Sequence, residues 1–183
     1  MKIRTLLTLL LLFIAAQAAS AGEDWKMELY KRAEALSIAL DKAEADILTR
    51  HEPKMAEFYT VYTPYQDAIR RMERYVFEKQ LKDNPGSIDW KDFKKWAWGW
   101  SFGTKEQENL AVEDSAYRAL REQFLGKKEV MKRAQALTRM RNKVYEQHSA
   151  ELAPLEEKLF NDLKALQAEV DRRMSNTPQE QSR

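Results

Sequence analysis

The stretch LYKRAEALSIALDKAEADI, residues 29–47, decides what kind of fold this chain adopts. Its apolar and small residues recur in alternating steps of three and four, at Leu29, Ala33, Leu36, Leu40, Ala43 and Ile47. This spacing places them along one side of an α-helix as a heptad seam, which is typical of a helix lying against another helix. We therefore expect a long helix here, packed along its length against a second helix.

The rest of the chain repeats this pattern. Apolar residues resume at helical steps after residue 55, and again between residues 110 and 170. Only five glycines and five prolines occur among the 183 residues, and long stretches contain neither. Because glycine and proline are the residues least compatible with a helix interior, their scarcity predicts an all-α protein with one sizeable core.

Local signals divide the chain into segments. We expect a signal peptide at 1–21 and a single helical domain at 22–174, followed by a disordered polar tail at 175–183. Within the domain lie a first arm at 24–81, a loop at 82–87, an aromatic insert at 88–103 and a second arm at 104–174. The loop prediction rests on the sequence KDNPGS, in which Asn, Pro, Gly and Ser follow one another.

Two architectures fit these arms. Straight arms would form an elongated antiparallel hairpin in which residues 41–57 lie beside residues 128–144. Arms that fold back at Pro53 and Gly126 would form a compact helical bundle. The near-continuous seams favour the elongated form, with a kink or break at Pro53 and a bend at Pro154. Self-association is possible in both forms, because the apolar seam of one chain can also pack against the seam of another chain.

The first 21 residues have the organisation of a secretory signal. Lys2 and Arg4 precede a short apolar run, and Ala19-Ser20-Ala21 offers a small-x-small cleavage pattern. The run is shorter than the roughly 20 residues that a membrane-spanning helix needs. We therefore expect a periplasmic or secreted bacterial protein, cleaved near Ala21.

Charge argues against nucleic acid as a partner. The chain has 31 basic and 29 acidic residues, and loss of Lys2 and Arg4 leaves 29 of each. A balanced chain lacks the basic excess that phosphate binding requires. Residues 127–143 are locally basic, and we expect them to pair with the acidic stretch 41–57; anionic lipid or cell-wall polymer is the alternative partner for this run.

The sequence contains few candidates for catalysis or metal binding. There is no cysteine, and the two histidines are His51 and His148. His51-Glu52 lacks the second histidine of a zinc-protease motif, and Glu151 follows His148 where di-iron bundles place the carboxylate first. The hairpin register separates the two histidines widely, so each is expected to be a partly buried packing residue. We expect no enzyme, cofactor or metal site.

The run WKDFKKWAWGWSF, residues 90–102, holds six large aromatic side chains and is the most distinctive chemistry of the chain. On a helical projection four of them share one stripe: Trp90, Phe93, Trp96 and Trp100. We interpret this stripe as a structural cap on the tip of the helical domain, carried by a short amphipathic helix.

Trp98 projects to the opposite side, among lysines, and Phe102 lies beyond Gly99. Exposed indole rings bind protein grooves, sugars and lipid interfaces. We therefore expect a partner-binding surface made of Trp98, Phe102, Lys91, Lys94 and Lys95.

No motif assigns the chain to a family. The leading hypothesis is a non-enzymatic, exported helical protein of the bacterial envelope that binds a protein partner through its aromatic tip, in the manner of a chaperone, adaptor or assembly factor. The alternative is a membrane-surface or cell-wall binding module that uses the same tryptophans and lysines. An enzyme with an unrecognised acidic site is a third, weaker hypothesis.

Overall fold

A computed structural model of the chain describes residues 2–83 and 111–176, with side chains from residue 25 onward. Every element in those ranges is an α-helix, which confirms the expected all-α class. Among these helices, none combines the length and the apolar character that crossing a bilayer demands. The aromatic insert and most of the polar tail fall outside the described residues.

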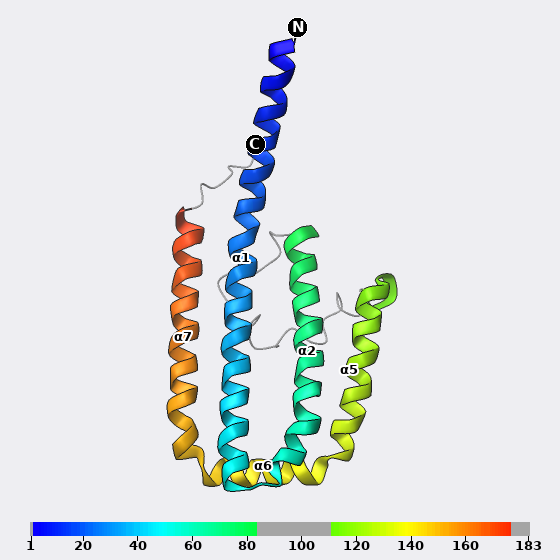
Figure 1. Cartoon of the computed structure of the whole chain (residues 1–183), viewed down its shortest axis with the longest axis vertical. Helices are drawn as coiled ribbons and strands as arrows, with labels where there is room; N and C mark the ends of the chain where they lie inside the picture. Colours follow the sequence, from blue (N-terminus) through cyan, green and yellow to red (C-terminus); the bar gives the residue numbers. More distant parts are fainter. Residues whose placement is uncertain (1, 84–110, 177–183) are drawn as a thin grey trace.

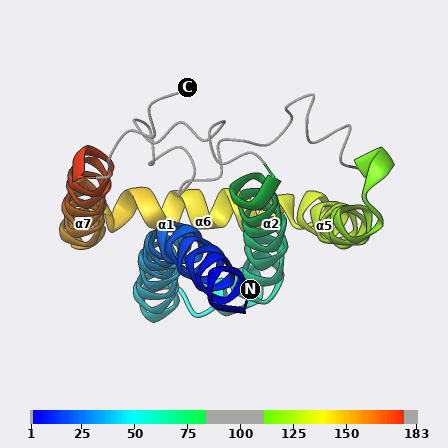
Figure 2. The same ribbon diagram turned by 90° about the horizontal axis from the view of Figure 1, so that it is seen from above.

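Four helices lie side by side, in the spatial order α7, α1, α2 and α5 (Figure 1). They are α7 (Ser149–Asn176), α1 (Lys2–His51), α2 (Met55–Asp83) and α5 (Ser115–Arg133). A fifth helix, α6 (Gln135–Gln147), runs across their lower ends. Seen from above, the row is curved, with α7 and α5 set back relative to α1 and α2 (Figure 2).

The first arm reverses direction at Pro53. The last turn of α1 closes with a hydrogen bond from the Glu52 amide to the Leu48 carbonyl, at 2.9 Å. The helical conformation is disfavoured for the residue before a proline, and a proline suits the start of the next helix. The chain therefore turns within three residues, and α2 runs back alongside α1 (Figure 1).

The second arm contains two turns that carry no glycine or proline. They lie at Ala134 and His148, which separate α5 from α6 and α6 from α7. At each turn the backbone amide is shared between two carbonyls of the preceding helix, which closes its last turn. Gly126, the turn expected of the compact form, lies inside α5, and Pro154, the expected bend, lies inside α7. From Ser115 to Asn176 the second arm is thus three helices in place of a single rod.

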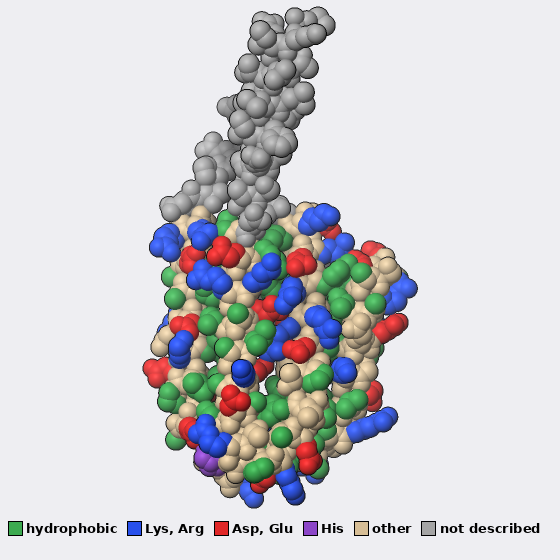
Figure 3. Space-filling model, viewed as in Figure 1, with side chains coloured by type: hydrophobic (Ala, Val, Ile, Leu, Met, Phe, Trp, Pro, Cys, Tyr) green, Lys and Arg blue, Asp and Glu red, His purple; other side chains and the backbone are tan. Residues whose placement is uncertain are grey.

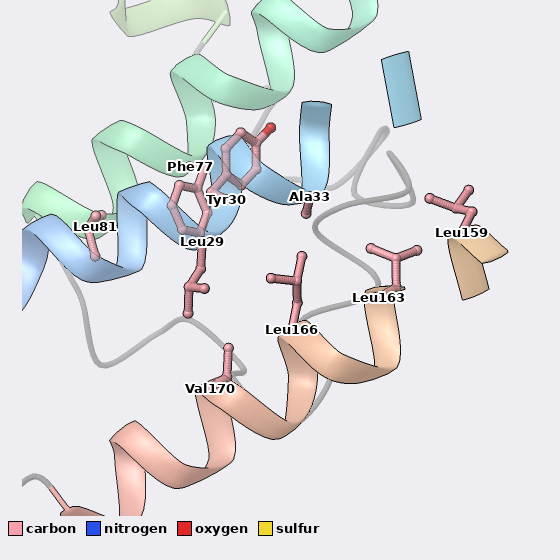
Figure 4. Packing of buried hydrophobic residues seen from close by; sticks show 9 residues of the cluster. All are labelled: Leu29, Tyr30, Ala33, Phe77, Leu81, Leu159, Leu163, Leu166 and Val170. Atoms are coloured by element: carbon pink, nitrogen blue, oxygen red, sulfur yellow. The ribbon is translucent and has the colours of Figure 1, made fainter. Parts of the chain in front are cut away.

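Buried apolar residues hold the row together in three clusters. The cluster shared by α1, α2 and α7 is drawn in Figure 4 and comprises Leu29, Tyr30, Ala33, Phe77, Leu81, Leu159, Leu163, Leu166 and Val170. Its centre is the stacked pair of Tyr30 and Phe77, whose ring centroids are 4.3 Å apart. A second cluster joins the ends of α1 and α2 to α6 and α7, and a third joins α2 to α5.

Ion pairs between the helices show which helices are neighbours and in which direction they run. Arg32 Nη1 contacts Glu169 Oε2 at 2.9 Å, and Arg50 Nη1 contacts Glu151 Oε1 at 2.9 Å, so α1 and α7 are antiparallel neighbours. Glu44 is paired with Arg141 of α6. The part of α1 from Arg32 to Arg50 therefore lies along α7, and the basic run 127–143 meets α1 at Glu44.

Candidate functional site

The residues predicted to bind a partner lie outside the described part of the structure. This applies to Trp98, Phe102, Lys91, Lys94 and Lys95, and equally to the predicted cap residues Trp90, Phe93, Trp96 and Trp100. Both sets stay predictions. The two helices on either side of this segment in the sequence are joined by a hydrogen bond. Tyr75 of α2 donates it to Asp114, the N-cap of α5, over 2.7 Å.

A groove with a partly apolar lining runs between α1 and α7. Its wider part has a volume of about 600 Å³ and its narrower part about 150 Å³, and Leu36 and Asp162 line both. On α1 the lining includes Ala35, Ala39 and Ala43, one turn apart. Their small side chains keep the groove open, since a longer side chain at these positions would fill it.

Charged side chains form the rim of this groove. Arg32, Arg172 and Glu169 line the wider part, and Lys158 lines the narrower part. Glu169 accepts hydrogen bonds from Arg32 of α1 at 2.9 Å and from Arg173 at 2.6 Å, and these bonds hold the pKa of Glu169 below its usual value despite partial burial. An apolar floor with a charged rim of both signs suits an amphipathic helix from another protein.

Buried carboxylates lie between α1 and α2. Glu34 and Glu73 are each 8 % exposed, and Glu34 Oε2 accepts a hydrogen bond from Arg74 at 2.5 Å. Burial raises the pKa of Glu73 to about 7; the charge of Glu34 acts in the same direction, and that of Arg70 opposes it. Glu73 Oε1 has no hydrogen-bond partner among the described residues. Both carboxylates thus belong to the buried interior between these helices.

The two histidines meet at the base of the molecule, where α1 ends and α6 gives way to α7. Their rings are stacked, with centroids 3.6 Å apart and planes inclined by 12°. His51 Nε2 lies 2.7 Å from Oε2 of Glu151, which is in the first turn of α7. Histidine side chains are visible at this end in Figure 3. The expectation that His51 and His148 are far apart is wrong.

The error has a definite physical cause. A straight second arm would carry His148 far from His51, and the turns at Ala134 and His148 bring it back. His148 is half-buried, in agreement with the expectation of a partly buried residue, and the side chain of His51 retains 31 % of its exposure. The signal available in the sequence was the pair His148 and Glu151, which are one helical turn apart.

The Glu151 carboxylate is held in its charged form. Its hydrogen bond to His51 lowers the pKa of Glu151, and Arg50 acts in the same direction. Imidazole nitrogens and a carboxylate oxygen are common ligands of transition metals. This cluster is therefore the place in the described structure where the chain's side chains come closest to a coordination site.

The basic run meets the acidic stretch at one point. Arg141 pairs with Glu44, which also accepts a hydrogen bond of 2.9 Å from Tyr59. Lys132 pairs with Glu129 of its own helix, while Arg139 and Lys143 are exposed and make no ion pair with any described residue. The expected pairing with residues 41–57 thus involves a single arginine in this part of the chain.

Comparison with known proteins does not assign the chain to a family. No family model matches the chain, and neither a curated protein nor a solved structure shows significant similarity to it.

Proposed function

We propose that this chain is an exported, non-enzymatic helical protein of the bacterial cell envelope that binds a protein partner as a chaperone, adaptor or assembly factor. The observation that carries the proposal is the groove between α1 and α7, with its alanine and leucine lining and charged rim. A helix of a partner would bury its apolar face there, and its charged flanks would meet Arg32, Arg172 or Lys158.

Cleavage of the signal is compatible with this fold. Among the residues of α1 whose side chains are described, from residue 25 onward, the buried ones begin at Leu29, so removal of the first 21 residues takes away none of this described core. The mature chain would then lie in the periplasm or outside the cell, with a formal net charge of zero. Fractionation of cells and N-terminal sequencing of the envelope form test this step; a mature protein that still begins at Met1 contradicts it.

The aromatic segment is the second proposed contact surface. Asp114, which lies beyond this segment in the sequence, accepts a hydrogen bond of 2.7 Å from Tyr75 in the C-terminal half of α2. The C-terminal end of α2 is the end opposite α6 (Figure 1). A surface made of Trp98 and Phe102 would act with the groove or separately from it, and single substitutions distinguish the two.

The test is capture of partners from an envelope extract with wild-type protein and three variants. Ala165→Arg fills the groove, Trp98→Ala removes the predicted aromatic contact, and Ala168→Arg is the matched control. Ala165 and Ala168 are both exposed on α7, but only Ala165 lines the groove. A partner retained by the control and lost with Ala165→Arg or Trp98→Ala supports the proposal. Equal capture by all four proteins contradicts it.

A membrane-surface or cell-wall module is the alternative, favoured by the lysines at positions 91, 94 and 95 beside Trp98. Co-sedimentation with anionic liposomes and with peptidoglycan separates the two functions. A partner-binding protein should pellet with neither, whereas a surface-binding module should pellet with one of them and lose this on Trp98→Ala. The solution mass of the purified chain tests self-association.

A further inference from the structure

We propose that His51, His148 and Glu151 form a binding site for a divalent transition-metal ion, with zinc as the ion whose preferences they fit best. The proposal goes beyond partner binding and stands independently of it. It rests on a juxtaposition: the chain has two histidines, 97 positions apart in sequence, and the fold stacks them against one another beside a carboxylate.

The three ligating atoms are close enough to share one ion. One nitrogen from each histidine and one oxygen from Glu151 all lie within 4.8 Å of one another. Zinc takes nitrogen and oxygen ligands at about 2.0–2.2 Å, which places neighbouring ligand atoms of a tetrahedral site about 3.4 Å apart. Movements of about an ångström, well within side-chain reach, therefore assemble the site.

The chemistry of the ligands selects the ion. Two imidazoles and a carboxylate are a set found on zinc, which leaves a fourth position for water. Copper(II) and nickel(II) also favour imidazole, whereas calcium and magnesium prefer sites made of oxygen ligands alone. The site lies at the surface, because His51 and Glu151 keep 31 % and 40 % of their side-chain exposure, so an ion can enter from solvent.

Arg50 supports the carboxylate from outside the ligand set. Its Nη1 atom lies 2.9 Å from Glu151 Oε1, which leaves Oε2 directed to His51. Such outer contacts fix the orientation of a ligand. The two histidine rings are nearly parallel, so the nitrogen lone pairs, which lie in the ring planes, occupy two stacked planes. Binding must therefore open the stack until the two lone pairs converge on the ion.

The fold also explains what an ion would do here. His51 ends α1, His148 forms the turn between α6 and α7, and Glu151 lies in the first turn of α7. An ion held by all three joins the end of α1 to the start of α7, between which the chain runs through α2, α5 and α6. It should stabilise the folded state, since the unfolded chain separates these ligands.

The experiment is zinc titration of the full chain, purified without a histidine tag and treated with chelator. We expect binding of a single ion by calorimetry, and a thermal midpoint about 5–10 °C higher when free zinc exceeds Kd a hundredfold. Cobalt(II) in place of zinc should give the visible absorption of a tetrahedral or five-coordinate site.

Substitutions assign the site. His148→Ala and His51→Ala should each weaken zinc binding by more than about 100-fold, and Glu151→Gln by about 10-fold or more. Glu157→Gln, an exposed carboxylate further along α7, is the control and should bind as wild type does. Far-UV circular dichroism of metal-free samples checks that each variant is folded, and Glu151→Gln, which preserves side-chain shape, covers the case in which a histidine variant fails to fold. Absence of zinc, copper and nickel binding overturns the proposal, as does zinc binding that survives replacement of both histidines.

Discussion

Glu73 provides the sharpest test of the packing between α1 and α2. Its carboxyl group is 8 % exposed, lies between Met72 and Arg74 on α2, and has its pKa raised to about 7 by burial. A glutamate in an unfolded chain has a pKa of about 4.5. Between these two pH values the folded protein binds a proton that the unfolded chain has released, so stability must fall as pH rises from about 4.5 to about 7.

The size of the effect follows from the two pKa values. A difference of about 2.5 units corresponds to about 3 kcal/mol of unfolding free energy, present at low pH and lost above pH 7. The Glu73→Gln variant carries a neutral side chain of the same shape at every pH. It should therefore be more stable than wild type by about 1 kcal/mol at pH 5 and by about 3 kcal/mol at pH 8.

The assay is urea unfolding of both proteins, followed by circular dichroism at pH 5, 6, 7 and 8. Glu78→Gln is the matched control, because Glu78 is exposed on the same helix. The difference between this control and wild type should stay constant over the range. A Glu73→Gln difference that does not change with pH, or that shrinks as pH rises, would falsify the burial of Glu73 against α1.

Two further predictions concern single packing and capping contacts. Phe77→Ala should destabilise the protein by about 3–5 kcal/mol, because Phe77 is fully buried and stacks on Tyr30. Phe160→Ala, at a position that is 47 % exposed, should cost less than about 1 kcal/mol. Equal losses of stability in thermal or urea unfolding would contradict the assignment of Phe77 to the core. Asp114→Ala should cost about 1 kcal/mol of stability, because the Asp114 side chain accepts hydrogen bonds from the amides of Ala116 and Tyr117. Asp114→Asn should retain most of this stability, because asparagine also caps helices. An asparagine variant that is as unstable in urea as the alanine variant would argue against capping.

The helical class was predictable because it depends on spacing that every segment repeats. The steps of three and four through Leu29, Ala33 and Leu36 need no knowledge of the partner helix to be recognised. A break in the helix at Pro53 was also predictable, because a proline removes an amide hydrogen bond wherever it occurs. What the spacing left open was whether the chain bends or reverses there, since the seam continues on both sides.

The turns at Ala134 and His148 could not be predicted in the same way. Both residues are compatible with a helix interior, and only the packing of α6 across the ends of α1 and α2 makes a turn favourable there. Tertiary contacts thus overrode local propensity. The histidine cluster depends on these two turns. A prediction of a straight second arm therefore placed His51 and His148 far apart.

The two proposed sites share one pair of helices, and this has a thermodynamic consequence. The groove lies between α1 and α7, and the histidine cluster joins the end of α1 to the first turn of α7. An ion that binds more tightly to one spacing of these helices must bias the spacing on which groove binding depends. If zinc changes the affinity for a partner by some factor, the partner must change the affinity for zinc by the same factor. Ala165→Arg, which blocks the groove and lies far from the ligands along α7, should abolish that coupling while leaving zinc binding intact.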